Sequence, residues 1–495
     1  MTDTTSLENF LARIGEIIKI LSSHNPFFLF SHPKVRGNLI PYLHQVEFLS
    51  RIMFRRPIRV LLADEIGLGK TISALMTIRK LYDNNELKRV LIVVPRILVN
   101  QWFSEIIRAG FTAPRRIERY TIERLVREGF PDGIYLASMD LIKREEYFNK
   151  LADVNWDMIV VDEAHRLGAK KNDKTQRYKK IGLGLIYSKP ERHALLLSAT
   201  PHRGDPNDYL ARLMLLDPFL EPGGSLNSVF FYAKTHNVLV FRRTKIDVNN
   251  VYEKRKIFTD CKLEAIIVAA NQYEKEFHER LVNFLRTKLL EFYDKSGIEP
   301  KALGLLMALI FKRASSSPYA ALVTMERIIE RRAYFLQGVI DDRFIRGIKR
   351  DTRTLAGTIL GIGYEDYPET MYDGSLRDID DLINDFAARC SVFLTDADIH
   401  EIRKLMELAN KIKENDSRLL TLINLVKMYT EEGRKIVIFT EYKDTVEYIY
   451  QALSKEIGCE KIVIVTGDTV RDSIRFEKIK RKFCLLYTSP SPRDR

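Results

Sequence analysis

Apolar residues in the first half of the chain occur as short continuous runs, separated by longer stretches with helical spacing. Short runs without polar alternation are typical of strands that are buried on both faces. Strands that alternate with helices favour a parallel sheet covered by helices on both faces. The first half of the chain is therefore predicted to be an α/β domain, with strands at residues 60–63, 90–94, 134–137, 158–161 and 194–198.

The pattern changes after Cys261, where apolar residues recur at helical spacing over much longer stretches. These stretches, 265–290, 301–336 and 395–413, predict a helical insertion. A helix beginning near Asp416 and strands at 435–440 and 461–465 then predict the start of a second α/β domain. The predicted organisation is an N-terminal helix with an irregular lead-in (1–35), a first α/β domain (36–260), a helical insertion (261–415), an incomplete second α/β domain (416–483) and a tail (484–495).

The segment DEIGLGKT, from Asp64 to Thr71, follows the first predicted strand and opens a helix. Gly67 and Gly69 allow backbone N–H groups to converge on phosphate oxygens. In such a loop Lys70 reaches the β- and γ-phosphates and the hydroxyl of Thr71 ligates magnesium. Asp64 stands where the general pattern has its first glycine, and an ordinary turn is the alternative. The residues predicted to bind ATP here are Asp64, Glu65, Gly67, Leu68, Gly69, Lys70 and Thr71.

A second segment, VVDEAHR (160–166), places two carboxylates at the carboxyl end of a predicted parallel strand. Ligands bind at this edge in open α/β sheets. Asp162 is predicted to hold magnesium through water, and Glu163 to polarise the attacking water. Lys70, Asp162 and Glu163 are the candidate catalytic residues. Thr71 and Asp162 are the candidate metal ligands, with ATP and magnesium as the expected cofactors.

Five segments, in this order, resemble the superfamily 2 helicases: DEIGLGKT, VVPRILVNQW (93–102), VVDEAHR, LLLSATPHRGD (195–205) and FRRTKIDV (241–248). Within that superfamily the chain is similar to the Swi/Snf-type DNA translocases, and in particular to their RapA/HepA-like branch. The similarity is dense over residues 39–248 and thinner afterwards. It implies a RecA-like first lobe, a helical insertion and a partial second RecA-like lobe.

The resemblance also implies roles for residues outside the two central segments. Gln45 matches the glutamine that reads the adenine edge. His165, with Ser198, Ala199 and Thr200, matches groups that couple the nucleotide to the nucleic-acid side. Taken singly, such residues are usually structural, and their order along the chain favours the functional interpretation. Residues that match contacts with the nucleic-acid backbone are Arg96, Ser138, Thr440, Tyr442, Thr466 and Gly467.

A segment of the insertion, residues 311–332, resembles a stretch that packs near the DNA path in RapA-like proteins. Its basic residues Lys312 and Arg313 are candidate DNA contacts, as are Arg331 and Arg332. The alternative is structural, because a serine followed by Pro318 also marks the start of a helix.

The chain is basic, since 79 lysines and arginines against 66 aspartates and glutamates leave a net charge of +13 over 495 residues. This balance favours a polyanionic partner, although a solvated basic surface has the same composition. Four cysteines, Cys261, Cys390, Cys459 and Cys484, lack paired spacing, so neither a disulfide framework nor a zinc ribbon is indicated. No segment reaches the ~18 consecutive apolar residues that a membrane span needs. We expect a cytoplasmic, nucleoid-associated prokaryotic protein with no membrane partner.

Residues 484–495, CLLYTSPSPRDR, fit neither helix nor strand and resemble the in-frame translation of a sequencing adapter. A natural disordered tail is the alternative that composition favours. On the adapter interpretation the chain is a C-terminally truncated fragment without the family's arginines that reach the γ-phosphate. Because such an arginine contributes roughly a thousandfold in rate, we expect the fragment to hydrolyse ATP poorly and the intact parent to be competent.

Three functions are compatible with these observations. The first is a translocase that moves on duplex DNA without sequence specificity and remodels protein–DNA complexes, acting on RNA polymerase or another DNA-bound protein. The second is a strand-separating DNA or RNA helicase. The third is a nucleic-acid-binding scaffold without motor activity, which the presence of Lys70, Thr71, Asp162 and Glu163 disfavours.

Overall fold

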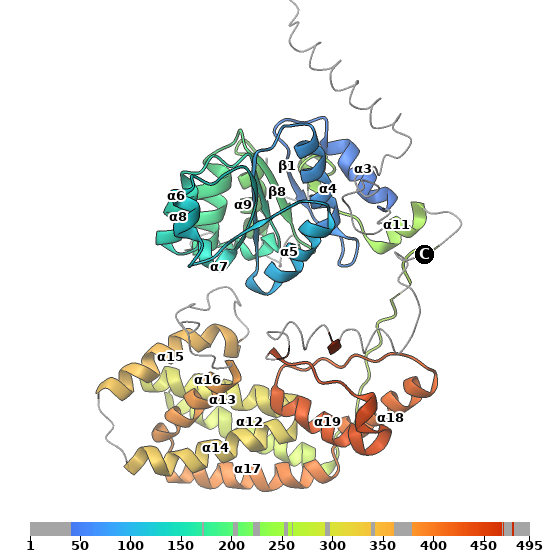
Figure 1. Ribbon diagram of the computed structural model, residues 1–495. Helices are drawn as coiled ribbons and strands as arrows, with labels where there is room; N and C mark the ends of the chain where they lie inside the picture. Colours follow the sequence, from blue (N-terminus) through green and yellow to red (C-terminus); the bar gives the residue numbers. More distant parts are fainter. Residues whose placement is uncertain are drawn as a thin grey trace, which may run out of the picture. The chain divides into compact units, whose positions relative to one another are not determined.

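The computed structural model describes residues 41–479, apart from 171–172, 201–205, 221–227, 252–255, 260, 293–297, 338–341, 361–378, 468 and 470–477. Within these residues the chain divides between Cys261 and Lys262 into two compact units, which we describe separately (Figure 1). The predicted N-terminal helix (1–35) and the tail (484–495) lie outside the described residues.

The first unit is built on a seven-stranded sheet in which all neighbouring strands are parallel. The five predicted strands are all present within about a residue of their expected bounds, which confirms the α/β class. Two short strands at the ends of the sheet, β3 and β9, were not predicted. The strand order is β3 (Arg115–Ile117), β4 (Gly133–Ser138), β2 (Arg89–Val94), β5 (Met158–Val161), β8 (His193–Leu197), β1 (Arg59–Leu62) and β9 (Val240–Phe241).

Successive residues of the central strands enter opposite hydrophobic cores, because side chains alternate along a strand. Leu61 of β1 lies in one core, whereas Val60 and Leu62 lie in the other. Helices pack on both sides of the sheet (Figure 1), as the sequence predicts. One core includes α3 (Leu43–Ile52), α4 (Lys70–Asp83) and α5 (Val99–Arg108). The other includes α6 (Ile122–Arg127), α7 (Met139–Ile142), α8 (Glu145–Ala152), the helical segment Tyr178–Tyr187, α9 (Pro206–Leu216) and α10 (Val229–Thr235).

Two further elements of the first unit lie close to the carboxyl ends of strands. A short antiparallel hairpin, β6 (Ala169–Lys170) with β7 (Asp173–Lys174), follows β5. Helix α11 (Lys245–Val251) follows β9, the last strand of the sheet.

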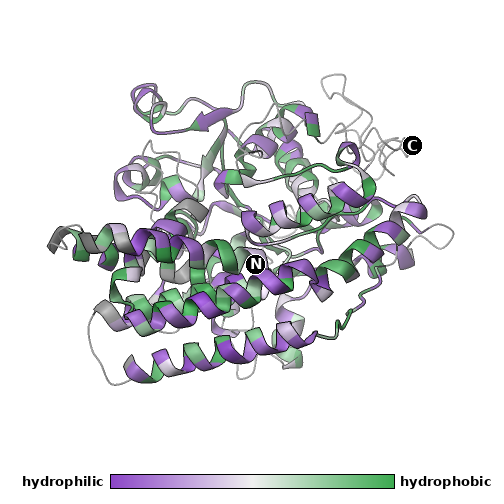
Figure 2. Ribbon diagram, turned by 90° about the horizontal axis from the view of Figure 1, so that it is seen from below, coloured by the Kyte–Doolittle hydropathy of each residue, from purple (hydrophilic) through white to green (hydrophobic). Residues whose placement is uncertain are grey.

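The second unit is helical in its described residues, and its long helices carry both apolar and polar positions (Figure 2). The apolar residues of α12 to α17 form one core. None of the described helices of the chain is both long enough and apolar enough to cross a membrane. The helices are α12 (Gln272–Phe292), α13 (Ile298–Ser316), α14 (Pro318–Gln337), α15 (Asp342–Leu360), α16 (Ile379–Cys390), α17 (Asp396–Glu414), α18 (Ser417–Glu431) and α19 (Lys443–Ile457).

Local capping explains where the structure departs from the predicted helix bounds. The helix expected to start at residue 265 begins at Gln272, because Asn271 and Glu274 form a reciprocal cap: Glu274 N donates to Asn271 Oδ1 at 3.0 Å and Asn271 N to Glu274 Oε2 at 2.7 Å. The stretch 301–336 is two helices. Ser317 caps the second, since its Oγ accepts from Ala320 N at 3.0 Å, and Pro318 is its first residue, as expected.

The predicted strands at 435–440 and 461–465 are wrong for this structure. Neither segment joins a sheet in the part of the chain that the structure describes. Several of their apolar side chains are exposed, with Phe439 91%, Val437 58% and Val465 45% accessible. An extended apolar segment becomes a strand only when its backbone groups find a paired neighbour, and the sequence pattern cannot supply one.

Two arginines of the basic segment 311–332 make structural ion pairs. The Arg313 side chain is fully buried; its Nη1 lies 2.5 Å from Asp444 Oδ2, and its guanidinium carbon lies 4.3 Å from the centre of the Tyr442 ring. Arg331 pairs with Asp385 at 2.7 Å. The expected DNA contact of Arg313 is therefore wrong, because a buried guanidinium paired with a carboxylate is unavailable to phosphate.

Candidate nucleotide-binding site

Three neighbouring parallel strands bring the predicted nucleotide and coupling residues to one edge of the sheet. The sheet order places β8 between β5 and β1, and Leu197 is paired with Leu62 and Leu196 with Val161. The segments 64–71, 162–166 and 198–200 follow these strands directly. Since parallel strands end at the same edge, the three segments converge where α/β sheets bind ligands.

The phosphate-loop segment has the backbone that its glycines predict. Gly67 and Gly69 have φ values of +91° and +81°, a left-handed region that L side chains rarely adopt. Helix α4 begins immediately afterwards at Lys70, whose Nζ donates to Asp64 O at 2.8 Å. Burial lowers the pKa of Lys70 against the opposing effect of nearby carboxylates, chiefly Asp64. The loop therefore presents backbone donors beside a partly desolvated ammonium group.

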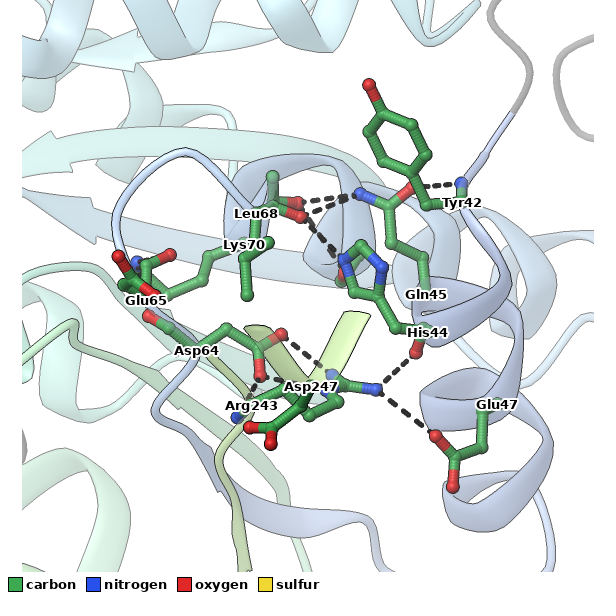
Figure 3. Close-up of polar contacts among 12 residues, drawn as sticks. Tyr42, His44, Gln45, Glu47, Asp64, Glu65, Leu68, Lys70, Arg243 and Asp247 are labelled. Carbon is green, nitrogen blue, oxygen red and sulfur yellow. Dashed lines mark hydrogen bonds and ion pairs between the residues drawn. The ribbon is translucent and has the colours of Figure 1, made fainter. Parts of the chain in front are cut away.

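Helix α3 supports this loop from the side, as Figure 3 shows. Nε2 of His44 lies 2.9 Å from Leu68 O, and Gln45 Nε2 donates to Leu68 O at 3.2 Å and to Gly69 O at 3.3 Å. The other end of the Gln45 amide accepts from Tyr42 N at 3.0 Å. Gln45 is thus a buried support of the loop, and its contact with adenine stays a prediction. His44 was missed by sequence reasoning because a single histidine in a helix has no distinguishing pattern.

Arg243, from the FRRTKIDV segment, holds the start of the loop. Its Nη2 lies 2.7 Å from Asp64 Oδ2, its Nε donates to Asp64 Oδ1 at 2.9 Å, and its Nη1 donates to the carbonyl of His44 (Figure 3). Asp64 is fully buried. The Asp64 carboxylate, which we predicted to bind ATP, is thus occupied by Arg243, and its part in the site is to fix the loop.

Trp102 orients the candidate magnesium carboxylate. Its indole Nε1 donates to Asp162 Oδ2 at 2.8 Å, and Glu163 N donates to Asp162 Oδ1 at 2.8 Å. Burial raises the pKa of Asp162, whereas the bond from Trp102 lowers it. Sequence analysis recognised the segment that ends at Trp102 but gave this residue no role, since nothing in one sequence links positions 60 residues apart.

Glu163 lies in a strained backbone conformation beside the predicted coupling residues. Its φ of +51° is uncommon for a residue with a side chain, and such strain clusters at functional sites. His165 Nδ1 lies 3.1 Å from Glu163 Oε2, 3.1 Å from Ser198 Oγ and 3.4 Å from Thr200 Oγ1. The hydrogen bond from His165 lowers the pKa of Glu163. His165 thus connects the candidate catalytic carboxylate with the segment after β8, which includes Ala199.

The donor set suits magnesium. Asp162 provides carboxylate oxygens, and Thr71, the second residue of α4, provides a hydroxyl at the same edge. Magnesium prefers oxygen ligands and keeps several waters, so it is usually held by one or two carboxylates together with substrate phosphates. Among the described residues there is no group of three or more His, Cys, Asp or Glu side chains that could hold a metal alone. The residues therefore fit an ion shared with a nucleotide.

The predicted nucleic-acid residues fall in both units. Ser138 is the last residue of β4, and Arg96 follows the paired strand β2, at the same edge as the nucleotide residues. Arg96 is exposed, and Ser138 Oγ accepts from Leu141 N at 3.1 Å, capping α7. The other four, in the second unit, are Thr440, Tyr442, Thr466 and Gly467. The Tyr442 ring is only 5% exposed beneath Arg313, so it is a packing residue and we withdraw its predicted contact.

The three segments that follow β1, β5 and β8 lie in a region that matches a known family model. Residues 43–237 match the model of the SNF2-related domain. RNA polymerase-associated protein RapA of Proteus mirabilis is 32% identical over 252 residues, which are 49% of this chain and 25% of that protein. RapA of Sodalis glossinidius is 39% identical over 191 residues, 37% of this chain and 19% of that protein. The chain thus spans a quarter or less of the length of these curated relatives.

Solved structures of related type are also similar. The Sulfolobus solfataricus SWI2/SNF2 ATPase core in complex with dsDNA is 16% identical with a TM-score of 0.37, covering 92% of this chain and 79% of that chain. The Pyrococcus furiosus Hef helicase domain is 17% identical with a TM-score of 0.41, and the match covers 84% of this chain and 78% of that chain. The sequence matches thus fall on the parallel sheet that carries the motifs at its carboxyl edge, and residues 43–237 of the chain are similar to the SNF2-related domain.

Proposed function

We propose that the first unit binds ATP with magnesium at the carboxyl edge of its sheet, and that it is the ATPase part of a motor that moves on duplex DNA. The observation that carries the proposal is the convergence of three segments on that edge. The glycine-containing loop with Lys70, the carboxylates Asp162 and Glu163, and the coupling group around His165 follow β1, β5 and β8, which are neighbours in the sheet. This combination supports phosphoryl transfer to water.

Each group has a defined part in the proposed reaction. Lys70, partly desolvated, neutralises charge on the β- and γ-phosphates. Asp162, oriented by Trp102, would hold a magnesium ion, which would screen the phosphate charge. Glu163 orients the attacking water and stays ionised because its pKa is lowered by His165. Through Ser198 and Thr200, His165 would transmit the state of the nucleotide to the rest of the lobe.

The proposed nucleic-acid partner rests on separate evidence. The chain has a net charge of +13, which favours a polyanion. The SWI2/SNF2 core named above was solved with dsDNA, and the RapA relatives are described as RNA polymerase-associated. We propose duplex DNA as the track, read through its phosphates and so without sequence specificity, and RNA polymerase or another DNA-bound protein as the object that the motor displaces.

Nucleotide binding is tested first on the chain itself. Mant-ATP fluorescence should show binding that requires magnesium and is lost in Lys70→Ala, because the ammonium group is the main cation at the loop. Lys189→Ala, which changes an exposed lysine of the same unit, is the matched control and should bind as the unsubstituted chain does. Equal binding by Lys70→Ala and Lys189→Ala would refute the proposed site.

The motor activity is tested on the full-length protein. A triplex-displacement assay measures translocation on duplex DNA, and a forked-duplex assay measures strand separation. We expect ATP-dependent triplex displacement, abolished by Lys70→Ala, without unwinding. Unwinding would instead identify a strand-separating helicase, and DNA binding with neither activity would identify a scaffold.

A further inference from the structure

Lys245 lies over the phosphate loop, although the two are far apart in the sequence. A Cβ atom built at Gly67 would lie 3.6 Å from Cε of Lys245 and 4.0 Å from its Nζ. Gly67 is exposed, as are both the Lys245 side chain, at 37%, and its neighbour Ile66, at 70%. The ammonium group of Lys245 therefore lies beside the solvent-facing part of the loop, where phosphates would approach.

The backbone around Lys245 is fixed at this place by several hydrogen bonds. Its own N donates to Glu65 Oε2 at 2.8 Å, and Glu65 N donates to Arg243 O at 2.9 Å. Thr244 and Asp247 form a reciprocal cap for α11, with Thr244 N donating to Asp247 Oδ2 at 2.7 Å and Asp247 N to Thr244 Oγ1 at 3.2 Å. The position of Lys245 is thus determined by the fold of the segment.

The ion pair between Lys245 and Glu65 is long and exposed to solvent. Nζ of Lys245 lies 3.7 Å from Glu65 Oε1, and both side chains are more than a third exposed. A surface pair of this kind contributes little to stability, so exchanging it for a phosphate costs little. An ammonium group beside a polyphosphate forms a charge-assisted hydrogen bond, which is stronger than a bond between neutral groups.

We propose that Lys245 is a second phosphate-binding cation, which acts with Lys70 on the β- and γ-phosphates of the nucleotide. The proposal rests on the proposed binding of ATP at this loop. Lys70 contacts the loop from within, through the carbonyl of Asp64, whereas Lys245 reaches it from the outside at Gly67. Bound phosphates would be held between two ammonium groups that come from opposite ends of the unit's sequence.

The competing explanation is that Lys245 only neutralises Glu65. In that case its removal would weaken nucleotide binding because an unscreened carboxylate repels the phosphates. A double-mutant cycle separates the two explanations. If Lys245 contacts phosphate, Lys245→Met weakens binding whether or not Glu65 is charged; if it only screens, the effect disappears in a Glu65→Gln background.

The experiment measures mant-ATP affinity, with magnesium, for the chain, Lys245→Met, Glu65→Gln and the double variant, with Lys189→Met as control. We expect Lys245→Met to lower affinity about tenfold or more in both backgrounds, and Lys245→Arg to retain most of it. Tryptophan fluorescence verifies folding, and Lys245→Gln replaces any variant that unfolds.

Two results would overturn the proposal while leaving ATP binding intact. One is affinity that is unchanged in Lys245→Met, and the other is a loss that vanishes in the Glu65→Gln background. If the unsubstituted chain binds no mant-ATP, or if Lys70→Ala binds equally well, the proposed function itself fails.

Discussion

Arg243→Met should destabilise the first unit strongly, because it leaves Asp64 without its partner. The Asp64 carboxylate is fully buried, and Arg243 supplies both guanidinium bonds to it as well as a backbone bond, from Arg243 N to Asp64 Oδ1 at 3.0 Å. The methionine side chain preserves much of the volume but donates no hydrogen bond, so only the backbone N–H of residue 243 would still reach Asp64.

The magnitude follows from the cost of an unpaired buried charge. Removing one partner of such a pair typically costs about 3–5 kcal/mol. Arg243 also donates to the carbonyl of His44, so we expect the upper half of that range. In Asp64→Asn/Arg243→Met the charge is removed with its partner, and the loss should be smaller than in Arg243→Met alone.

Urea unfolding followed by tryptophan fluorescence measures this effect selectively. The chain has two tryptophans, Trp102 and Trp156, and both are buried in the first unit. A loss of about 4 kcal/mol should lower the urea midpoint by at least about 1 M. Arg124→Met is the matched control, because Arg124 is 65% exposed and its pair with Glu128 is 3.6 Å long. The reasoning is refuted if Arg243→Met and Arg124→Met unfold within about 1 kcal/mol of each other.

Three further predictions concern pH and the second unit. Trp102→Phe removes a hydrogen bond that lowers the pKa of Asp162, so magnesium-dependent mant-ATP binding should be lost at a higher pH; an unchanged midpoint would contradict this. Burial lowers the pKa of His193 to about 4. Between pH 6.5, the ordinary pKa of histidine, and pH 4, the unfolded chain binds a proton at His193 and the folded chain does not. The free energy of unfolding should therefore fall by up to about 3 kcal/mol as the pH drops through this range. A flat pH profile in tryptophan-monitored unfolding would be inconsistent with this prediction. Arg313→Met should destabilise α13 and α19 by about 3 kcal/mol, because Asp444 would keep only its longer ion pair with Arg327, at 3.9 Å. Amide hydrogen exchange measures this effect, and unaltered protection would argue against the pair.

Local sequence patterns predicted the strands that are buried on both faces. The strands β1, β2, β4, β5 and β8 are apolar because both of their faces are covered, and this leaves a continuous run in the sequence. The short end strands β3 and β9 carry no such run. The segments 435–440 and 461–465 have the run but join no sheet among the described residues, since pairing depends on partners that a local pattern does not reveal.

The candidate site was predicted where a motif is contiguous and missed where it is assembled in space. Lys70, Asp162 and Glu163 belong to segments whose order and spacing indicate nucleotide chemistry. Trp102 and Arg243 act on those segments from 60 and 179 residues away, and their contacts follow from strand order. Helical spacing and turn residues give information only on neighbouring positions in the sequence. The structure is therefore needed to find supporting residues such as Trp102 and Arg243.

The bond between Asp64 and Arg243 has a consequence for synthesis on the ribosome. The two residues are 179 positions apart, so at about 5–20 residues per second Arg243 follows Asp64 by roughly 10 to 40 s. The strand β9, which pairs with β1, arrives at the same late stage. During that interval the phosphate-loop segment has neither its ion-pair partner nor its outer strand. The phosphate-loop segment is therefore among the last parts of its domain to gain its supporting contacts on the nascent chain.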